Sequence, residues 1–197
     1  MAKLYFKYGA MGSSKSAQAL ITQFNYEELG MTVWLIKPSV DDRDGANIVK
    51  SRVGLSREAE VITPEDSIRA RYAATGGRDV IIADEAQFLT PEQIDELRDI
   101  VDELNVPVLC FGLRTDFLTH MFPGSRRLME LADSITEVKT VCACGAKATV
   151  NARLTPDGRI VTEGEQVFLG GNDAYVAMCH RCWKKKITEQ SRVLMKK

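Results

Sequence analysis

The sequence contains little that would place the chain in a membrane or attract it strongly to a polyanion. No apolar run approaches the roughly 18 residues that a transmembrane helix needs. The 26 basic residues almost balance the 27 acidic ones, and the formal net charge of -1 excludes a global cationic field for nucleic acid. Residues 1–9 have too short an apolar stretch for a secretory signal. We therefore expect a cytoplasmic protein with no membrane and no nucleic acid as partner.

Internal repeats, low-complexity tracts and Pro/Gly/Ser-rich linkers are absent as well. Five cysteines are an odd number, and four of them form two close pairs, which argues against a disulfide framework. What is present suffices for a core: the 197 residues are 45% hydrophobic and 27% charged, so intrinsic disorder is excluded as the main state. The length fits one domain, or one domain with a small appendage.

Short segments of aromatic and β-branched residues predict the strands of a sheet. Residues 4–8 and 32–36 are two of them, and a helical pattern between them ends at Gly30, where a C-terminal cap belongs. Residues 79–83 and 106–111 are nearly continuous apolar runs, as expected when helices cover both faces of a sheet. A strand, a helix and a second strand within about 35 residues are typical of a βαβ unit. We predict an α/β fold with a parallel sheet flanked by helices.

Two helices are expected from their apolar spacing. In the first, Ala17, Leu20, Ile21 and Phe24 recur every three to four residues. The second has Thr90 as its N-cap, with Pro91 in the first helical position and Gln93 completing a capping box. Its apolar stripe consists of Ile94, Leu97, Ile100, Val101 and Leu104. Both helices are long enough to cover a face of the predicted sheet.

The character of the chain changes after residue 137. Residues 138–154 suggest strands around the first pair of cysteines, and residues 155–158 form a turn signal. We therefore divide the chain into a P-loop nucleotide-binding α/β domain (residues 1–137) and a small β domain stapled by a metal (residues 138–197).

The segment between the first strand and the first helix has the composition of a phosphate-binding P-loop. Its residues are Gly9, Ala10, Met11, Gly12, Ser13, Ser14, Lys15 and Ser16. Such a loop wraps backbone N–H groups around phosphate oxygens and places them at a helix N-terminus. Lys15 is expected on the terminal phosphates and the Ser16 hydroxyl on a magnesium ion. The usual second glycine of the motif is replaced by Ser14, and a strained serine there is expected to weaken ATP binding.

Two adjacent carboxylates follow the apolar strand at residues 79–83. Asp84 lies where nucleotide-hydrolysing P-loop proteins hold their magnesium, usually through water. Glu85 points elsewhere and is free to act as a general base toward an attacking hydroxyl. We include Asp84, Glu85, Ala86 and Gln87 among the ATP-binding candidates.

Four cysteines have the spacing of a structural zinc site. Cys142 and Cys144 form one knuckle, Cys179 and Cys182 form the other, and 34 residues separate the two knuckles. The second knuckle has the common C-x-x-C spacing, whereas C-x-C is tighter and less typical. His180 is an alternative ligand that could replace a cysteine.

Taken together, these motifs resemble the type II thymidine kinases, the cytosolic zinc-containing P-loop family, and most of all its enterobacterial branch. The resemblance runs in order over essentially the whole chain. It also includes residues 111–117 and 170–175. It implies transfer of the γ-phosphate of ATP to the 5′-hydroxyl of thymidine or deoxyuridine in nucleotide salvage, with Glu85 as general base and Ser16 and Asp84 on magnesium.

The same resemblance implies a nucleoside site and an assembly. Met11, Leu113, Phe117 and Phe122 would line the nucleoside pocket. Gly170, Gly171 and Tyr175 would belong to a lasso loop that closes over the base, and the zinc would pin the two ends of that loop. Members of the family are usually homotetramers inhibited by thymidine triphosphate.

Two other functions remain open at this point. One is a P-loop ATPase with a zinc ribbon that acts on nucleic acid, for which the residues 84–87 would be a helicase-like motif. The other is a nucleotide-binding regulator that has lost turnover, which Ser14 would favour.

Overall fold

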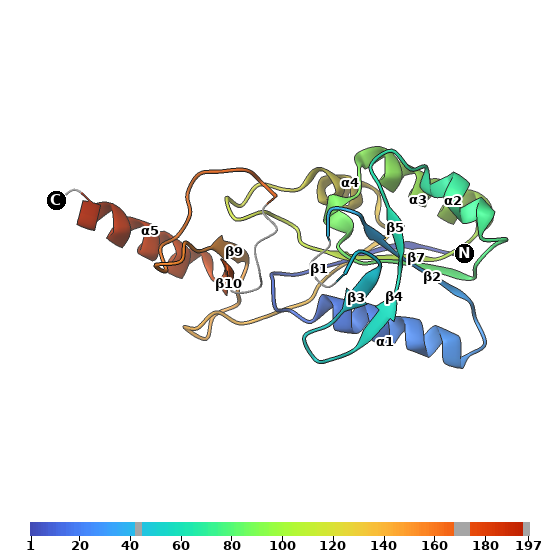
Figure 1. Cartoon of the computed structure of the whole chain (residues 1–197), viewed down its shortest axis with the longest axis horizontal. Coiled ribbons are helices and arrows are strands. Elements are labelled where there is room, and N and C mark those ends of the chain that lie inside the picture. The colour runs from blue at the N-terminus through green and yellow to red at the C-terminus, as the bar shows by residue number, and fades with distance from the viewer. Residues whose placement is uncertain (42–44, 168–173, 195–197) are drawn as a thin grey trace.

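The computed structural model describes residues 1–41, 45–167 and 174–194. Its largest element is a six-stranded sheet (Figure 1). The six strands are β1 (Leu4–Tyr8), β2 (Val33–Pro38), β5 (Glu60–Ile62), β6 (Val80–Ala83), β7 (Val108–Gly112) and β8 (Ser134–Glu137). Their order is β5-β2-β6-β7-β1-β8, and every neighbouring pair is parallel. The predicted parallel sheet is confirmed.

Helices cover both faces of this sheet. The helix α1 (Lys15–Glu28) lies on one face, whereas α2 (Ile68–Ala74), α3 (Pro91–Leu104) and α4 (Pro123–Leu131) lie on the other (Figure 1). Alternate residues of each strand serve the two cores: Ile81 packs toward α3, and Ile82 packs toward α1. This two-sided burial explains why the central strands are almost continuously apolar.

The helix α1 buries a different stripe from the one that its apolar residues suggest. Ala17, Leu20 and the small Ala19 are buried, whereas Ile21 and Phe24 are half exposed. The small side chains allow the helix to lie close to the sheet. Ile21 and Phe24 therefore form an apolar surface on the outer side of α1.

The helix α3 begins as predicted. The Gln93 amide donates to the Thr90 hydroxyl at 3.2 Å, and the Gln93 side-chain oxygen accepts from the Thr90 amide at 3.1 Å. The predicted stripe is buried except for its last member, Leu104, which is about half exposed at the end of the helix. Asn105 follows in the left-handed conformation and ends the helix.

The C-terminal unit is smaller and more irregular than the sheet domain. Only β9 (Val150–Arg153) forms from the predicted strand region 138–154, and it pairs antiparallel with β10 (Tyr175–Met178). The residues before β9 form a cysteine-containing turn closed by a bridge between Val141 and Lys147. A long helix, α5 (His180–Leu194), extends from this unit away from the sheet (Figure 1).

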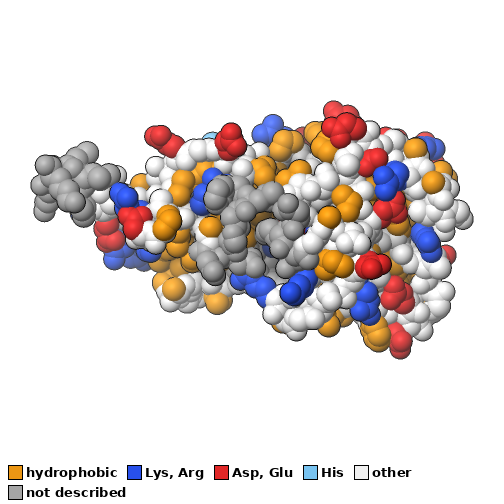
Figure 2. All heavy atoms as spheres, in the orientation of Figure 1, with side chains coloured by type: hydrophobic (Ala, Val, Ile, Leu, Met, Phe, Trp, Pro, Cys, Tyr) orange, Lys and Arg blue, Asp and Glu red, His pale blue; other side chains and the backbone are white. Residues whose placement is uncertain are grey.

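A short hairpin, β3 (Ile48–Lys50) and β4 (Ser56–Glu58), lies on the α1 side of the sheet (Figure 1). Among the described residues, no helix is long and apolar enough to cross a bilayer. Acidic and basic side chains are interspersed on the face that Figure 2 shows, which fits the balanced composition.

Candidate active site

The carboxyl ends of the parallel strands bring the predicted motifs to one edge of the sheet. The P-loop follows β1, Asp84 follows β6, and Leu113 follows β7, which lies between those two strands. In an open parallel sheet this edge is where ligands bind. A cavity of about 360 Å³ lies there.

The P-loop is a tight turn that leads directly into α1. The Ser13 amide donates to the Ala10 carbonyl at 3.2 Å, and Gly12 has a φ of +75°, which suits glycine. Ser14 is the N-cap of α1 and adopts the left-handed conformation, with φ 62° and ψ 27°. Its side chain makes no capping hydrogen bond. Ser14 thus has the left-handed backbone conformation in which a residue with a Cβ is strained.

Lys15 is buried at the start of α1. Its ammonium donates to the Ala10 carbonyl at 3.0 Å and to the Ser13 hydroxyl at 3.3 Å. These contacts hold the charge beside the loop whose N–H groups would receive phosphate. Backbone N–H groups, a helix N-terminus and a buried cation together make an anion site.

Asp84 and Glu85 occupy different environments although they are adjacent. Asp84 is buried, and burial, together with the Glu85 charge, raises the pKa of its carboxyl to about 7 despite a hydrogen bond with Ser16. A divalent cation favours the ionised carboxylate, so Ser16 and Asp84 are a fitting pair of oxygen ligands for magnesium. Glu85 is less buried, and its backbone is left-handed, with φ 50°. This turn places two neighbouring side chains in different environments.

Gln87 connects the carboxylates to the next strand. Its buried amide nitrogen donates to the Glu85 carboxylate, and its oxygen accepts from the Leu113 amide at 2.9 Å. Gly112 allows this approach, since a Cβ there would lie 2.5 Å from the same oxygen. Gln87 thus fixes Glu85 relative to the end of β7.

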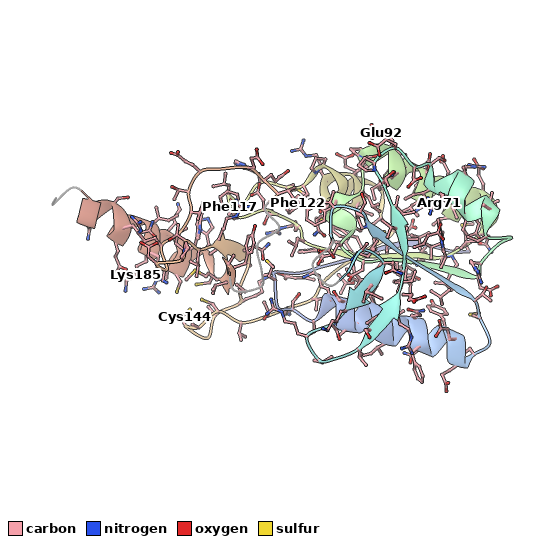
Figure 3. The ribbon with its side chains drawn as sticks, in the orientation of Figure 1. Arg71, Glu92, Phe117, Phe122, Cys144 and Lys185 are labelled. Carbon is pink, nitrogen blue, oxygen red and sulfur yellow. The ribbon has the colours of Figure 1, made fainter. Side chains whose placement is uncertain are left out.

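The cavity brings together residues from most of the predicted motifs. Those that line it are Met11, Gly12, Ser14, Lys15, Ser16, Asp84, Glu85, Gln87, Leu113, Phe117, Phe122 and Tyr175. Gly9, Ala10, Ser13 and Ala86 lie in the same loops but not on the described lining. Gly170 and Gly171 lie outside the described residues. Phe117 and Phe122 lie between the sheet and the C-terminal unit (Figure 3), where they form an apolar wall of the cavity.

Several lining residues were not found from the sequence. Ser51 and Arg52 come from the β3–β4 hairpin, and Gln166 precedes the proposed lasso. Asn151 is buried in β9, where its oxygen accepts from the Met11 amide and its nitrogen donates to the Thr115 carbonyl, both at 2.8 Å. A polar residue alternating with apolar ones in a strand normally faces solvent, so no signal marked Asn151 as buried.

The four cysteines of the predicted zinc site converge. The sulfurs of Cys142, Cys144, Cys179 and Cys182 all lie within 4.8 Å of one another, and that of Cys144 is 3.6 Å from that of Cys179. Zn–S bonds of about 2.3 Å in a tetrahedron require sulfurs about 3.8 Å apart, so the donor set fits zinc. Backbone N–H groups of Cys144 and Cys179 lower the pKa of the Cys142 thiol to about 6, which favours the thiolate.

His180 is not part of this cluster. Its side chain is exposed, and its ring packs against that of Trp183, with centroids 5.4 Å apart. Among the described residues, the four cysteines are the only group of three or more His, Cys, Asp or Glu side chains that could hold one metal ion together.

Comparison with known proteins agrees with the geometry. The model of the thymidine kinase family matches residues 2–183. A thymidine kinase of Yersinia pestis is 47% identical over 191 residues, which cover 95% of this chain and 97% of that protein. Thymidine kinases of Ruegeria pomeroyi and Salmonella typhimurium are 46% and 44% identical and cover 94% and 97% of this chain, and 95% of their own lengths. The chain belongs to the thymidine kinase family.

Proposed function

We propose that the protein transfers the γ-phosphate of ATP to the 5′-hydroxyl of thymidine, and of deoxyuridine, in nucleotide salvage. The observation that carries this proposal is the composition of the cavity. An anion-binding loop with a buried lysine, an apolar aromatic wall and a carboxylate pair all line this one cavity. A phosphate donor and a flat nucleobase can therefore share the same space, with the reacting atoms near Glu85.

In the proposed reaction, the oxygen of the 5′-hydroxyl attacks the γ-phosphorus, and Glu85 accepts the proton of that hydroxyl. The bond from that phosphorus to the β–γ bridging oxygen breaks, and ADP leaves. Lys15 and the P-loop amides stabilise the charge on the phosphate oxygens. Ser16 and Asp84 would hold magnesium, which neutralises charge on the β- and γ-phosphates when bound. Gln87 orients Glu85 through the hydrogen bond between their side chains.

The nucleoside would bind against Met11, Leu113, Phe117 and Phe122, with Tyr175 at the edge of the cavity. Gly170 and Gly171 are proposed to contribute backbone hydrogen bonds to the base. Thymidine triphosphate carries both the base and a triphosphate, so it could occupy the nucleoside wall and the P-loop together. We therefore propose it as an inhibitor.

Zinc is proposed as a structural ion held by the four cysteines. It would join the turn before β9 to the start of α5, and so close the segment that contains β9, the lasso and β10. The proposed boundary after residue 137 coincides with the end of β8, the last strand of the parallel sheet. Four thiols kept reduced for zinc are in keeping with a cytoplasmic location.

A homotetramer is proposed as the assembly. The half-exposed Ile21 and Phe24 on α1 would become buried if two copies associated through this face. Light scattering with size-exclusion chromatography tests this directly. A monomer over the micromolar range would contradict the proposal.

The function is tested by following ADP release from ATP and magnesium with thymidine, with single-stranded DNA, and with neither. Thymidine-dependent release, together with recovery of thymidine monophosphate, is expected. Release that depends on DNA would instead indicate a nucleic-acid motor. Tight ATP binding without release in any arm would indicate a regulator without turnover.

A further inference from the structure

Arg153 is an arginine buried at the end of β9. Its side chain is in the C-terminal unit, and only 7% of its surface is exposed. In the antiparallel pairing of β9 with β10, it lies opposite Tyr175. A buried guanidinium costs free energy unless its N–H groups find partners. Those partners show which parts of the molecule the side chain holds together.

The guanidinium contacts three segments of the chain, at residues 117, 165–166 and 175. Its Nε donates to the Tyr175 hydroxyl at 2.9 Å. Its Nη1 and Nη2 donate to the carbonyls of Glu165 and Gln166, at 3.0 and 3.3 Å. Its central carbon lies 3.8 Å from the centroid of the Phe117 ring, so the guanidinium stacks on the aromatic face. One planar group thus uses both its edge and its face.

Three of these partners line the cavity, whereas Arg153 does not belong to the lining that the structure describes. Phe117 contributes from the loop after β7, Gln166 from the segment before the proposed lasso, and Tyr175 from β10. Arg153 therefore affects the cavity through the lining residues that it contacts, and it is not itself part of the described lining. Its contacts set the distance between the aromatic wall and the chain segments on either side of residues 168–173.

A second contact joins the segment at residue 166 to the loop that carries Phe117. The Gln166 side-chain amide donates to the buried Asp116 carboxylate at 2.9 Å. Asp116 also accepts from the amides of Leu118 and His120, at 2.8 and 2.9 Å, and so holds its own loop in shape. The loop that carries Phe117 is thus braced, and the segment at residue 166 is attached to it from two sides.

We propose that Arg153 is a positioning residue for the nucleoside-binding wall, and that it sets the affinity for the nucleoside without affecting the phosphate donor. This rests on the proposed thymidine kinase function. The described contacts of Arg153 lead to Phe117, Gln166 and Tyr175 and not to the P-loop or the carboxylate pair. A lysine has no fork of donors and no flat face, so it cannot reproduce the three hydrogen bonds and the stacking together.

The test compares Arg153→Lys with Arg159→Lys. Arg159 lies in the same unit and pairs with Asp157, but its side chain is exposed, so it controls for the substitution itself. We expect Arg153→Lys to raise the thymidine KM at least tenfold, which corresponds to about 1.4 kcal/mol. The ATP KM and kcat should stay within about twofold, because a displaced nucleoside wall weakens binding of the ground state and of the transition state alike, which changes the thymidine KM alone.

A purely structural role would look different. It would lower the zinc content and the thermal midpoint, and would raise both KM values or lower the amount of active enzyme. That pattern, or a thymidine KM within twofold of the wild type, would overturn the proposal. If Arg153→Lys does not fold, Arg153→Gln is measured by the same criteria, because it removes the buried charge together with the fork.

A double-mutant cycle with Tyr175→Phe locates the effect. If the two side chains act together, the double variant should be less impaired than the product of the single effects. Independent, multiplicative effects would overturn the role of the Arg153–Tyr175 contact. Wild-type protein without thymidine-dependent ADP release would contradict the proposed function, whereas a normal thymidine KM in an active Arg153→Lys enzyme would contradict only the positioning role.

Discussion

Substitution of Ser14 tests whether the backbone strain in the P-loop reduces the stability of the fold or the affinity for ATP. Ser14 occupies the position before the P-loop lysine where glycine is usual, and its φ of 62° lies in the left-handed region. The residue is exposed, and its hydroxyl caps nothing. Ser14→Gly therefore removes the strain of a Cβ in this conformation without removing a capping interaction.

The magnitude follows from two opposing terms. A non-glycine residue in the left-handed conformation costs about 1–2 kcal/mol. Glycine also has more conformational freedom in the unfolded chain, which destabilises the folded state of the Ser14→Gly variant by about 0.5–1 kcal/mol. The net stabilisation is about 0.5–1 kcal/mol, which for a chain of this size raises Tm by about 1–4 °C.

The same geometry predicts that ATP affinity does not change. The carbonyl of the left-handed Ser14 accepts the Gln18 amide at 3.0 Å in the first turn of α1, so the fold itself fixes this conformation. We therefore assign the strain to folding and expect none to be added when ATP binds. Strain on binding would instead give Ser14→Gly a several-fold lower KM, as the sequence alone suggests. We expect the Ser14→Gly enzyme to have a higher Tm and an ATP KM within twofold of wild type at saturating thymidine.

Ser14→Ala is the matched control, because it keeps the Cβ and removes only the hydroxyl. Its Tm should not rise. The measurements are thermal unfolding by circular dichroism and initial rates against ATP concentration. A several-fold drop in the ATP KM of Ser14→Gly without a rise in Tm would refute the reasoning, since the loop would then become strained only around the nucleotide.

Three further outcomes are expected. Glu85→Gln should keep both substrates bound but lower kcat by about 10²- to 10⁴-fold, and a kcat within a few-fold of wild type would remove Glu85 as the base. Elemental analysis should find one zinc per chain, and Cys179→Ser or chelation should lower stability and raise the thymidine KM; freshly purified protein without metal would refute this. The hydrogen bonds from Arg98 and from the Leu4 amide hold the pKa of Asp133 below its usual value. Because a lowered folded-state pKa stabilises only above the unfolded value, Asp133→Asn should lower Tm by about 1–3 °C at pH 7. This difference should begin to shrink near pH 4 and vanish once the pH falls below the lowered pKa of Asp133 in the folded protein, and a difference that does not shrink in this range would count against the carboxylate charge as its cause.

Much of the fold could be read from the sequence because its signals are local. The capping box of Thr90 and Gln93 needs only four neighbouring residues, and the structure contains both of its hydrogen bonds. The continuous apolar runs at β6 and β7 reflect burial on both faces, which a strand cannot achieve outside a covered sheet. The predicted cysteine cluster is likewise confirmed as a convergence of sulfurs, because four thiols at this spacing form a common set of zinc ligands.

Periodicity was a poorer guide where close packing selected among apolar residues. Ile21 and Phe24 have helical spacing but are half exposed, whereas Ala17, Ala19 and Leu20 are the apolar residues that α1 buries. The choice depends on the distance between two elements, and a single helix does not contain that information.

By itself, the sequence predicted β1, β2, β6 and β7 and the helices α1 and α3, and it marked the P-loop, the carboxylate pair and the four cysteines as candidates. It did not predict β5, β8, α2 or α4. Only the tertiary structure decided how the nucleoside wall is held. Asn151 and Arg153 are ordinary polar residues of a short strand, and their partners lie from about 12 to 140 positions away along the chain. A buried polar side chain takes its role from the donors and acceptors that face it, and chain folding alone brings those groups within hydrogen-bonding distance.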